Sequence, residues 1–317
     1  MANASSKVLY AALAGNLLVT VTKFIAAAIT HSSAMLSEAV HSLVDTTNEV
    51  LLIYGEHQAT RQADASHPLG YGRELYFWSF VVALLIFTVG AGVSTFQGVM
   101  HILNPVELER PVVNYVVLGV AFVFELGSWV VAFREFRARK GSDGYIEAAV
   151  ETRDPSTLMV FFEDSAAMAG IAIALGGTLA THLTGNPVYD GAASICIGLL
   201  LGVIATFLVY ENKKLLIGEP ARPEMVRSIA QIATEDPCIA KFNGLITIHI
   251  GPRQIVASLS LHFDPTLCGP RLEEAAERLE DRVRKKHPDI TTLLIKPQSP
   301  ERYRETLASR WQEPDEG

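Results

Sequence analysis

The chain has 317 residues and a formal net charge of −8, and 49% of its residues are hydrophobic while only 19% are charged. Average soluble domains carry about 25% charged residues, so this composition excludes intrinsic disorder and makes a membrane protein the first hypothesis. The negative net charge argues against a nucleic-acid binder, which would usually carry a basic patch.

Charge is distributed unevenly along the chain. Residues 1–220 hold 31 of the 60 charged residues, and the shorter stretch that follows holds the other 29. We therefore expect a membrane domain over residues 1–216 and a soluble domain over residues 217–317. The three cysteines form neither a CxxC pair nor a disulfide framework, and we expect Cys196, in an apolar run, to be a small buried side chain.

Six stretches are long and apolar enough to cross a bilayer, which takes about 20 residues in a helix. We expect an all-α bundle of six transmembrane helices, at residues 8–29, 33–55, 77–103, 112–133, 157–183 and 187–210. The second and fifth are the weakest by hydropathy because they contain acids and a histidine. An ionisable group at membrane depth is costly and usually lines a polar path, so these two helices indicate function.

Basic residues in the loops predict the orientation. One side of the membrane would carry most of them, in the loops after segments 2 and 4 and at the end of segment 6: Arg61, Arg73, Arg134, Arg137, Arg139, Lys140, Arg153, Lys213 and Lys214. The other side has only Arg110. The sequence therefore predicts a multi-pass protein with both termini in the cytoplasm.

The tail reads as a small α+β unit in the order helix, strand, strand, helix, strand (αββαβ). A helix is expected at 222–234, strands at 245–250 and 254–263, a helix at 270–286 and a strand at 289–297. The second strand alternates with period 2, which places one set of apolar side chains on a single face: Ile255, Ala257, Leu259, Leu261 and Phe263.

Segment 2 carries a polar stripe inside an apolar helix. His41 and Asp45 are four residues apart, so they project from one helix face, with Asn48, Glu49 and Glu38 near the same stripe. Imidazole nitrogen and carboxylate oxygen are ligands that suit Zn²⁺ and its first-row neighbours.

Segment 5 offers two acids, Glu163 and Asp164. His41, Asp45 and Asp164 could thus surround one divalent ion near the membrane midplane. The alternative is that the histidine packs between helices and the acids make interhelical hydrogen bonds. Two further intramembrane charges are expected to be structural. Lys23 would reach the headgroups or pair with an acid such as Glu38 or Asp190, and Asp190 would have a structural role at the membrane interface.

Three segments resemble the cation diffusion facilitator family: SSAMLSEAVHSLVD (32–45), ADASHPLGYGRELYFWS (63–79) and NPVYDGAASICIGLLLG (186–202). Two others, RDPSTLMVFFEDSAAMAG (153–170) and GLITIHIGP (244–252), are similar to the branch that contains the animal mitochondrial zinc transporter. The resemblance implies a six-helix exporter of divalent metals with a cytoplasmic, metallochaperone-like tail, working as a homodimer.

The resemblance also implies a metal site of four residues, two on segment 2 and two on segment 5. Three positions match His41, Asp45 and Asp164, but the fourth falls on Val160, which cannot bind a metal. Water, Glu163 or Asn48 could supply the missing contact. Glu163 lies about 100° around the helix from Asp164, so it would join only if segment 5 were bent or rotated. Glu163, Asn48 and Glu49 are equally candidates for a proton relay.

Two other metal sites of this family are expected to be weak or absent. In the loop after segment 2, Asp64 and His67 match, but Tyr71 stands where a second histidine is common, and tyrosine is a poor zinc ligand at neutral pH. Loop hydrogen bonds are an equally good explanation of these residues. In the tail, where the available histidines are His249, His262 and His287, Lys296 lies near a ligand position and would repel a cation, so we expect dimerisation without a structural metal.

The sequence thus predicts a secondary transporter that exports a divalent cation, with Zn²⁺ as the transported substrate, in exchange for protons. No organic cofactor and no nucleic-acid partner are expected, and a bacterial plasma membrane is the expected location. The alternatives are a membrane metal sensor or scaffold that does not transport, or a transporter of Mn²⁺, Fe²⁺, Co²⁺ or Cd²⁺. The chain has neither an HExxH nor a GxSxG motif, which argues against an intramembrane hydrolase.

Overall fold

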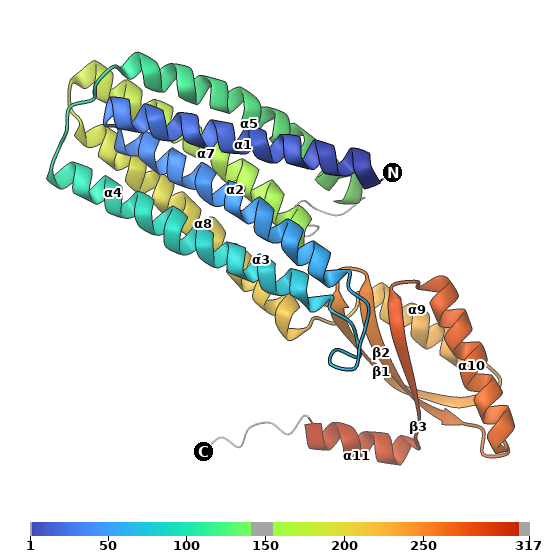
Figure 1. The fold of residues 1–317 in the computed structure, drawn as a ribbon. Coiled ribbons are helices and arrows are strands. Elements are labelled where there is room, and N and C mark those ends of the chain that lie inside the picture. Colours follow the sequence, from blue (N-terminus) through green and yellow to red (C-terminus); the bar gives the residue numbers. More distant parts are fainter. Residues whose placement is uncertain (1, 141–154, 311–317) are drawn as a thin grey trace, which may run out of the picture. The chain divides into compact units, whose positions relative to one another are not determined.

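The computed structural model describes residues 2–140 and 155–310 (Figure 1). The chain divides into two compact units, one formed by Met1–Thr60 with Glu74–Lys213 and the other by Arg61–Arg73 with Lys214–Gly317. We call them the helical unit and the tail unit. Arg153, one of the basic residues used to predict orientation, lies outside the described residues.

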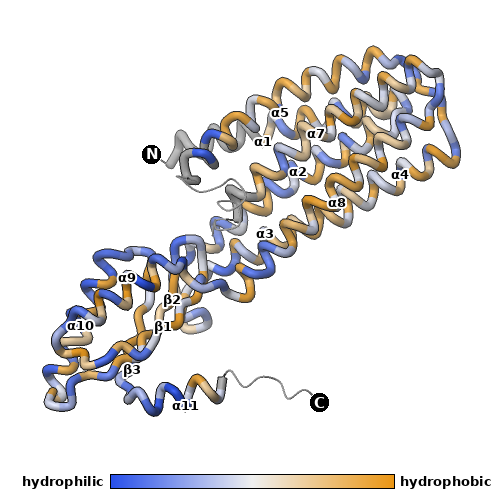
Figure 2. Tube along the Cα trace, turned by 180° about the vertical axis from the view of Figure 1, so that it is seen from behind, coloured by the Kyte–Doolittle hydropathy of each residue, from blue (hydrophilic) through white to orange (hydrophobic). Residues whose placement is uncertain are grey.

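The helical unit is a bundle of long helices lying side by side (Figures 1 and 2). Its elements are α1 (Ala2–Thr30), α2 (Ser33–Ala59), α3 (Arg73–Leu85), η1 (Ile86–Ala91), α4 (Gly92–Leu103), α5 (Pro111–Lys140), α7 (Pro155–Thr184) and α8 (Val188–Ile217). α3, η1 and α4 follow one another without a break, so the third expected helix is one run with a π-helical turn inside it. Gly185, with φ of 70°, makes the tight turn between α7 and α8, a conformation that suits glycine.

Five helical stretches are long and apolar enough to cross a membrane: Leu13–Thr30, Arg73–Leu103, Pro111–Val131, Met159–Thr184 and Val188–Ile217. α2 is 27 residues long but is not among them, because polar and charged side chains interrupt it. Ser37, Glu38, His41 and Asn48 are all buried inside the bundle rather than turned outward. The sixth span therefore stays a prediction, carried by a helix that shields its polar groups within the protein.

Hydrophobic residues predominate along the helices of the helical unit, as Figure 2 shows by colour. On α5 and α8 many large apolar side chains are exposed, among them Val116, Val123, Leu199 and Val203. A water-soluble bundle would bury such a surface, whereas lipid tails solvate it, so the chain is an integral membrane protein. Cys196 belongs to this outer surface, and the expectation that it is buried is wrong because it lies on the exposed side of α8.

The tail unit contains α9 (Pro223–Thr234), β1 (Ile239–Gly251), β2 (Gln254–Phe263), α10 (Gly269–Lys286), β3 (Ile290–Pro297) and α11 (Pro300–Arg310). The sheet order is β1-β2-β3, with β1 antiparallel and β3 parallel to β2. A small α/β sheet domain was predicted, but the element order differs from αββαβ by the added α11. The five alternating apolar residues of β2 are all buried, as predicted, against α9 and α10.

The loop between α2 and α3 belongs to the tail unit rather than to the bundle. A side chain at Gly72 would collide with the carbonyl oxygen of Ile250 and with the amide of Gln254, so the loop backbone runs directly against the β1–β2 turn. The predicted boundary between residues 216 and 217 places this loop in the other domain.

Candidate metal site in the helical unit

α2 begins at a network that reaches across the chain to α8. The side chain of Ser32 accepts a hydrogen bond from the backbone N–H of Met35, as an N-cap does. The buried carboxylate of Asp190 accepts hydrogen bonds from the backbone N–H groups of Ser33 (2.5 Å) and Ala34 (3.2 Å). A carboxylate at a helix N-terminus also complements the helix dipole, so Asp190 fixes the start of the helix that carries the predicted ligands. Its expected structural role agrees with this geometry.

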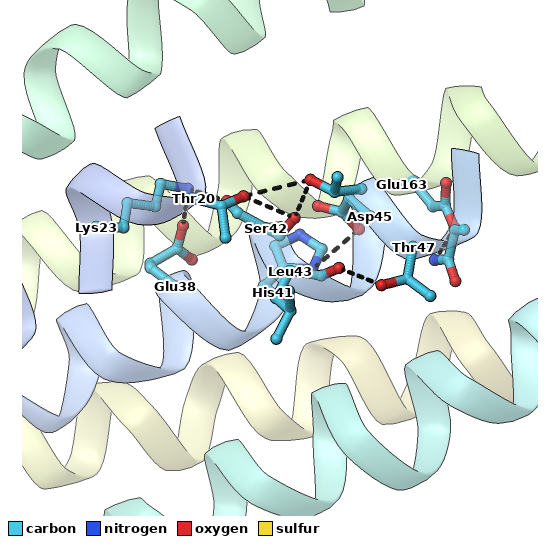
Figure 3. A network of polar contacts seen from close by, with 11 residues as sticks. Thr20, Lys23, Glu38, His41, Ser42, Leu43, Asp45, Thr47 and Glu163 are labelled. Atoms are coloured by element: carbon cyan, nitrogen blue, oxygen red, sulfur yellow. Dashed lines mark hydrogen bonds and ion pairs between the residues drawn. The ribbon is translucent and has the colours of Figure 1, made fainter. Parts of the chain in front are cut away.

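One turn further along α2, Lys23 of α1 forms a buried ion pair. Its Nζ lies 3.2 Å from Glu38 Oε2 and 2.7 Å from Ser42 Oγ, and both charged side chains are fully buried (Figure 3). Lys23 therefore pairs with Glu38, and not with Asp190 or the headgroups. Glu38 Oε1 faces Gly170 of α7, where any side chain would collide with it.

His41 and Asp45 project from the same face of α2, and the His41 Nδ1 lies 3.4 Å from Asp45 Oδ1 (Figure 3). The His41 side chain is 1% exposed. Within the described part of the chain, neither His41 ring nitrogen has a hydrogen-bond partner, and nor does Asp45 Oδ1. Buried polar atoms usually find a partner, so these atoms are available to bind a further group such as a metal ion or a water molecule.

Asp45 opens onto a cavity of about 460 Å³ enclosed by α1, α2, α5 and α7. Acidic side chains from three helices line it: Asp45, Glu49, Glu56, Glu125, Glu163 and Asp164. Asp45 and Asp164 thus line one cavity, and their role as ligands stays a prediction. His41 contacts Asp45 but is not itself part of the cavity wall.

Each of the two α7 acids is held by a neighbouring helix. Glu163 Oε1 accepts a hydrogen bond from Asn48 Nδ2 (2.8 Å), and Asp164 Oδ2 accepts one from Ser128 Oγ of α5 (3.0 Å). Glu163 and Asp164 are successive residues of α7, about 100° apart around the helix axis. Both nevertheless line the cavity, so Glu163 is also part of its wall. Asn48 and Glu163 are therefore partners of each other.

Two features limit what the site can hold in this arrangement. Val160, the position without a ligand, also lines the cavity and presents no donor atom. Within residues 2–140 and 155–310, no three His, Cys, Asp or Glu side chains are close enough together to hold a metal ion. The predicted ligands thus lie around one cavity without converging on a common point.

Glu125 is the residue that sequence reasoning missed. It is the only charged residue of the apolar stretch 112–133, and it lines the cavity from α5. A lone acid in a membrane span carries the same cost as those in segments 2 and 5, so the same argument would have identified it.

The loop residues Asp64, His67 and Tyr71 form a compact hydrogen-bonded turn in the tail unit. Asp64 accepts hydrogen bonds from the His67 backbone N–H (2.8 Å), from Ser66 Oγ (2.6 Å) and from Tyr71 OH (2.7 Å). These bonds hold the pKa of the Asp64 carboxyl well below its usual range. A metal site at Asp64 and His67 stays a prediction, and the geometry favours the structural explanation.

The tail histidines are spread over the tail unit. His249 is buried in β1, and Nε2 of His287 is hydrogen-bonded to Ser228 Oγ at 2.9 Å. Lys296 of β3 lies opposite Ser260 of β2 in the strand register. A tail without a structural metal stays a prediction.

Comparison with known proteins gives a consistent result. Residues 9–217 match the family model described as the cation efflux transmembrane domain. The chain is 35% identical over 260 residues to the human protein named proton-coupled zinc antiporter SLC30A9, mitochondrial, covering 81% of this chain and 46% of that protein. It is 32% identical over 262 residues to metal tolerance protein C4 of Arabidopsis thaliana, covering 82% of this chain and 57% of that protein. Magnetosome protein MamM of Magnetospirillum gryphiswaldense is 25% identical over 285 residues.

The chain spans about half the length of the animal and plant relatives that it matches. The animal relatives are named mitochondrial, so these comparisons give no support to the expectation of a bacterial plasma membrane.

Proposed function

Because this chain belongs to the cation diffusion facilitator, or cation efflux, family, we propose that it exports Zn²⁺ across a membrane in exchange for protons. Metal efflux is the activity of the family, and the cation and the coupling ion are the proposal. The human and mouse relatives bear the name of a proton-coupled zinc antiporter, which supports both choices.

One observation carries the proposal. His41 is a buried imidazole whose nitrogens have no hydrogen-bond partner among the described residues, and it contacts a carboxylate that opens onto an acidic cavity. A packing histidine would satisfy its nitrogens inside the protein, whereas a ligand histidine keeps one free for the ion. A nitrogen ligand beside carboxylates favours zinc over manganese, which prefers oxygen ligands alone.

We assign His41, Asp45 and Asp164 as the protein ligands of the transported ion. Each must be deprotonated to bind, so loading the metal releases protons and protonation from the other side releases the metal. Glu163, Asn48 and Glu49 are assigned to the relay of these protons, since Glu163 is bonded to Asn48 beside the cavity and Glu49 lines the same wall. Alternating access would come from tilting α2 and α7 against the other helices.

The remaining parts of the proposal concern topology and assembly. The apolar stretches together with α2 make six spans, the basic residues of the loops place both termini in the cytoplasm, and the tail unit serves as the dimerisation domain of a homodimer. Neither an organic cofactor nor a nucleic-acid partner is included.

The test is zinc flux into proteoliposomes that contain the purified protein, under an imposed pH gradient, read with an entrapped zinc-sensitive dye. We expect Asp45→Asn and Asp164→Asn to lower the initial rate at least ~10-fold, because mutating even the groups that orient metal ligands typically costs about 10–100-fold. Glu107→Gln, on the exposed connection between α4 and α5, is the matched charge control and should transport at the wild-type rate.

His41→Asp tests selectivity in the same vesicles. With zinc and manganese in competition, this all-oxygen site should lose its preference for zinc. Wild-type flux in both aspartate variants would refute the site, and zinc binding without flux in the wild-type protein would identify a sensor instead of a transporter.

A further inference from the structure

The assigned ligand set contains three protein groups, and the fourth position that the family resemblance implies falls on Val160. Val160 precedes Asp164 by four residues, so the two are neighbours on one face of α7, and both line the cavity. Valine has no donor atom, so this position of α7 cannot supply a ligand. Zinc in protein sites is usually four-coordinate, so the ion needs another donor from the cavity wall.

Helix α5 presents a side chain of the right chemistry to the same space. Ser128 of α5 donates a hydrogen bond to Asp164 (3.0 Å), and Trp129 Nε1 donates one to Ser165 Oγ (3.0 Å), which together attach α5 to α7 beside Asp164. Glu125 lies three residues before Ser128, on the same face of α5, and lines the cavity.

Glu125 interacts with the assigned ligands through charge rather than through a hydrogen bond. It acts electrostatically on both Asp45 and Asp164. In the described part of the chain no hydrogen bond or ion pair of Glu125 is found, and the cation that acts on it, Lys23, is paired with Glu38. Carboxylates gathered in a low-dielectric space repel one another, and a divalent cation between them would offset that repulsion.

His41 places a buried nitrogen donor beside Asp45, at the border of this acidic group. Neither ring nitrogen has a hydrogen-bond partner in the described residues, and Nδ1 lies 3.4 Å from Oδ1 of Asp45, which borders the cavity that Glu125 lines. On these grounds, and resting on the proposed function, we infer that Glu125 supplies the fourth protein contact to the transported cation, in place of Val160. The site would then draw on three helices, α2, α5 and α7, with an imidazole and three carboxylates.

The experiment compares zinc binding and zinc flux in matched variants of the full-length protein. Zn²⁺ affinity is measured by isothermal titration calorimetry in detergent, and the KM for zinc by proteoliposome flux. We expect Glu125→Gln, which keeps the size and removes the charge, to raise the dissociation constant and the KM about 10-fold. Glu125→Asp keeps the charge and should stay within ~3-fold of wild type.

The double variant Val160→Asp/Glu125→Gln supplies the decisive arm. It returns a carboxylate to α7 at the vacant position, so it should recover most of the affinity lost in Glu125→Gln. A structural role of Glu125 would not be repaired from another helix, and a variant that fails to fold would not be rescued at all. Size-exclusion profiles establish folding for each variant.

The outcomes separate this inference from the proposed function. If the wild-type protein neither binds nor transports zinc, the proposed function fails. If Asp45→Asn abolishes transport while Glu125→Gln binds zinc with wild-type affinity and KM, the function stands and the role of Glu125 is refuted. Loss in Glu125→Gln without any recovery in the double variant also overturns the inference.

Discussion

The buried ion pair between Lys23 and Glu38 makes a strong prediction about stability. Both side chains are fully buried, and the charged atoms lie 3.2 Å apart. At an effective dielectric constant of about 20, two unit charges at that separation attract by about 5 kcal/mol. Lys23→Met leaves Glu38 charged and without its partner in the bundle, and we expect a loss of about 3–5 kcal/mol in the free energy of unfolding.

The assay is a double-mutant cycle with Lys23→Met, Glu38→Gln and the combined variant, unfolded with SDS in mixed micelles and followed by circular dichroism. Because the combined variant has neither charge, we expect it to be within about 1–2 kcal/mol of the wild type, less destabilised than either single variant. The control cycle uses Arg302 and Glu305 of α11, an exposed pair at 2.8 Å, which should couple by no more than about 0.5 kcal/mol.

Additive effects in the cycle at Lys23 and Glu38 would refute the reasoning, since two independent side chains cannot be a buried pair. Single variants that lose less than about 1 kcal/mol would refute it as well, because they would show that water or another group replaces the missing charge.

Two other predictions concern the start of α2 and the tail unit. Asp190→Ala removes the acceptor of the Ser33 and Ala34 backbone N–H groups and should cost about 2–3 kcal/mol in the same SDS titration; a loss below about 0.5 kcal/mol would contradict the capping role. Burial, with the nearby Lys286 charge, lowers the pKa of His287 from its ordinary 6.5, so the folded tail binds this proton less well than the unfolded chain. Its contribution to stability is therefore present above pH 6.5 and is lost as the pH falls. Hydrogen exchange of α9 and α10, corrected for intrinsic rates, should be faster at pH 5.5 than at pH 7.5, and the difference should shrink in His287→Gln; identical responses in both proteins would contradict it.

The spacing of apolar and polar residues along the sequence correctly predicted the secondary-structure elements that have a regular buried face. The alternation of Ile255 through Phe263 identified β2 and its buried face, and the i, i+4 spacing of His41 and Asp45 placed both on one side of α2. α11 was missed because its sequence, PERYRETLASR, has no apolar stripe to bury, although exposed ion pairs such as Arg302–Glu305 accompany it.

Contacts between distant helices were harder to predict, because helical periodicity says which face a residue occupies but not which helix lies opposite. Lys23 had two equally good acidic partners in the sequence, and only packing selects Glu38 over Asp190. The bond from Asn48 to Glu163 joins residues 115 positions apart, and nothing in either helix alone specifies it. Glu125 was within reach of sequence reasoning, since a single acid in an apolar span is conspicuous.

The assignment of loop 61–73 to the tail unit changes how the two units are connected. The chain passes from one unit to the other after Thr60, after Arg73 and after Lys213. Three covalent connections therefore join the two units, whereas two consecutive domains would share a single linker. The tail is therefore a discontinuous domain, and a fragment that starts at residue 214 lacks one of its own segments. Such a fragment would expose the backbone around Ile250 that Gly72 covers in the intact chain, which makes the full-length protein the proper object for studying the tail.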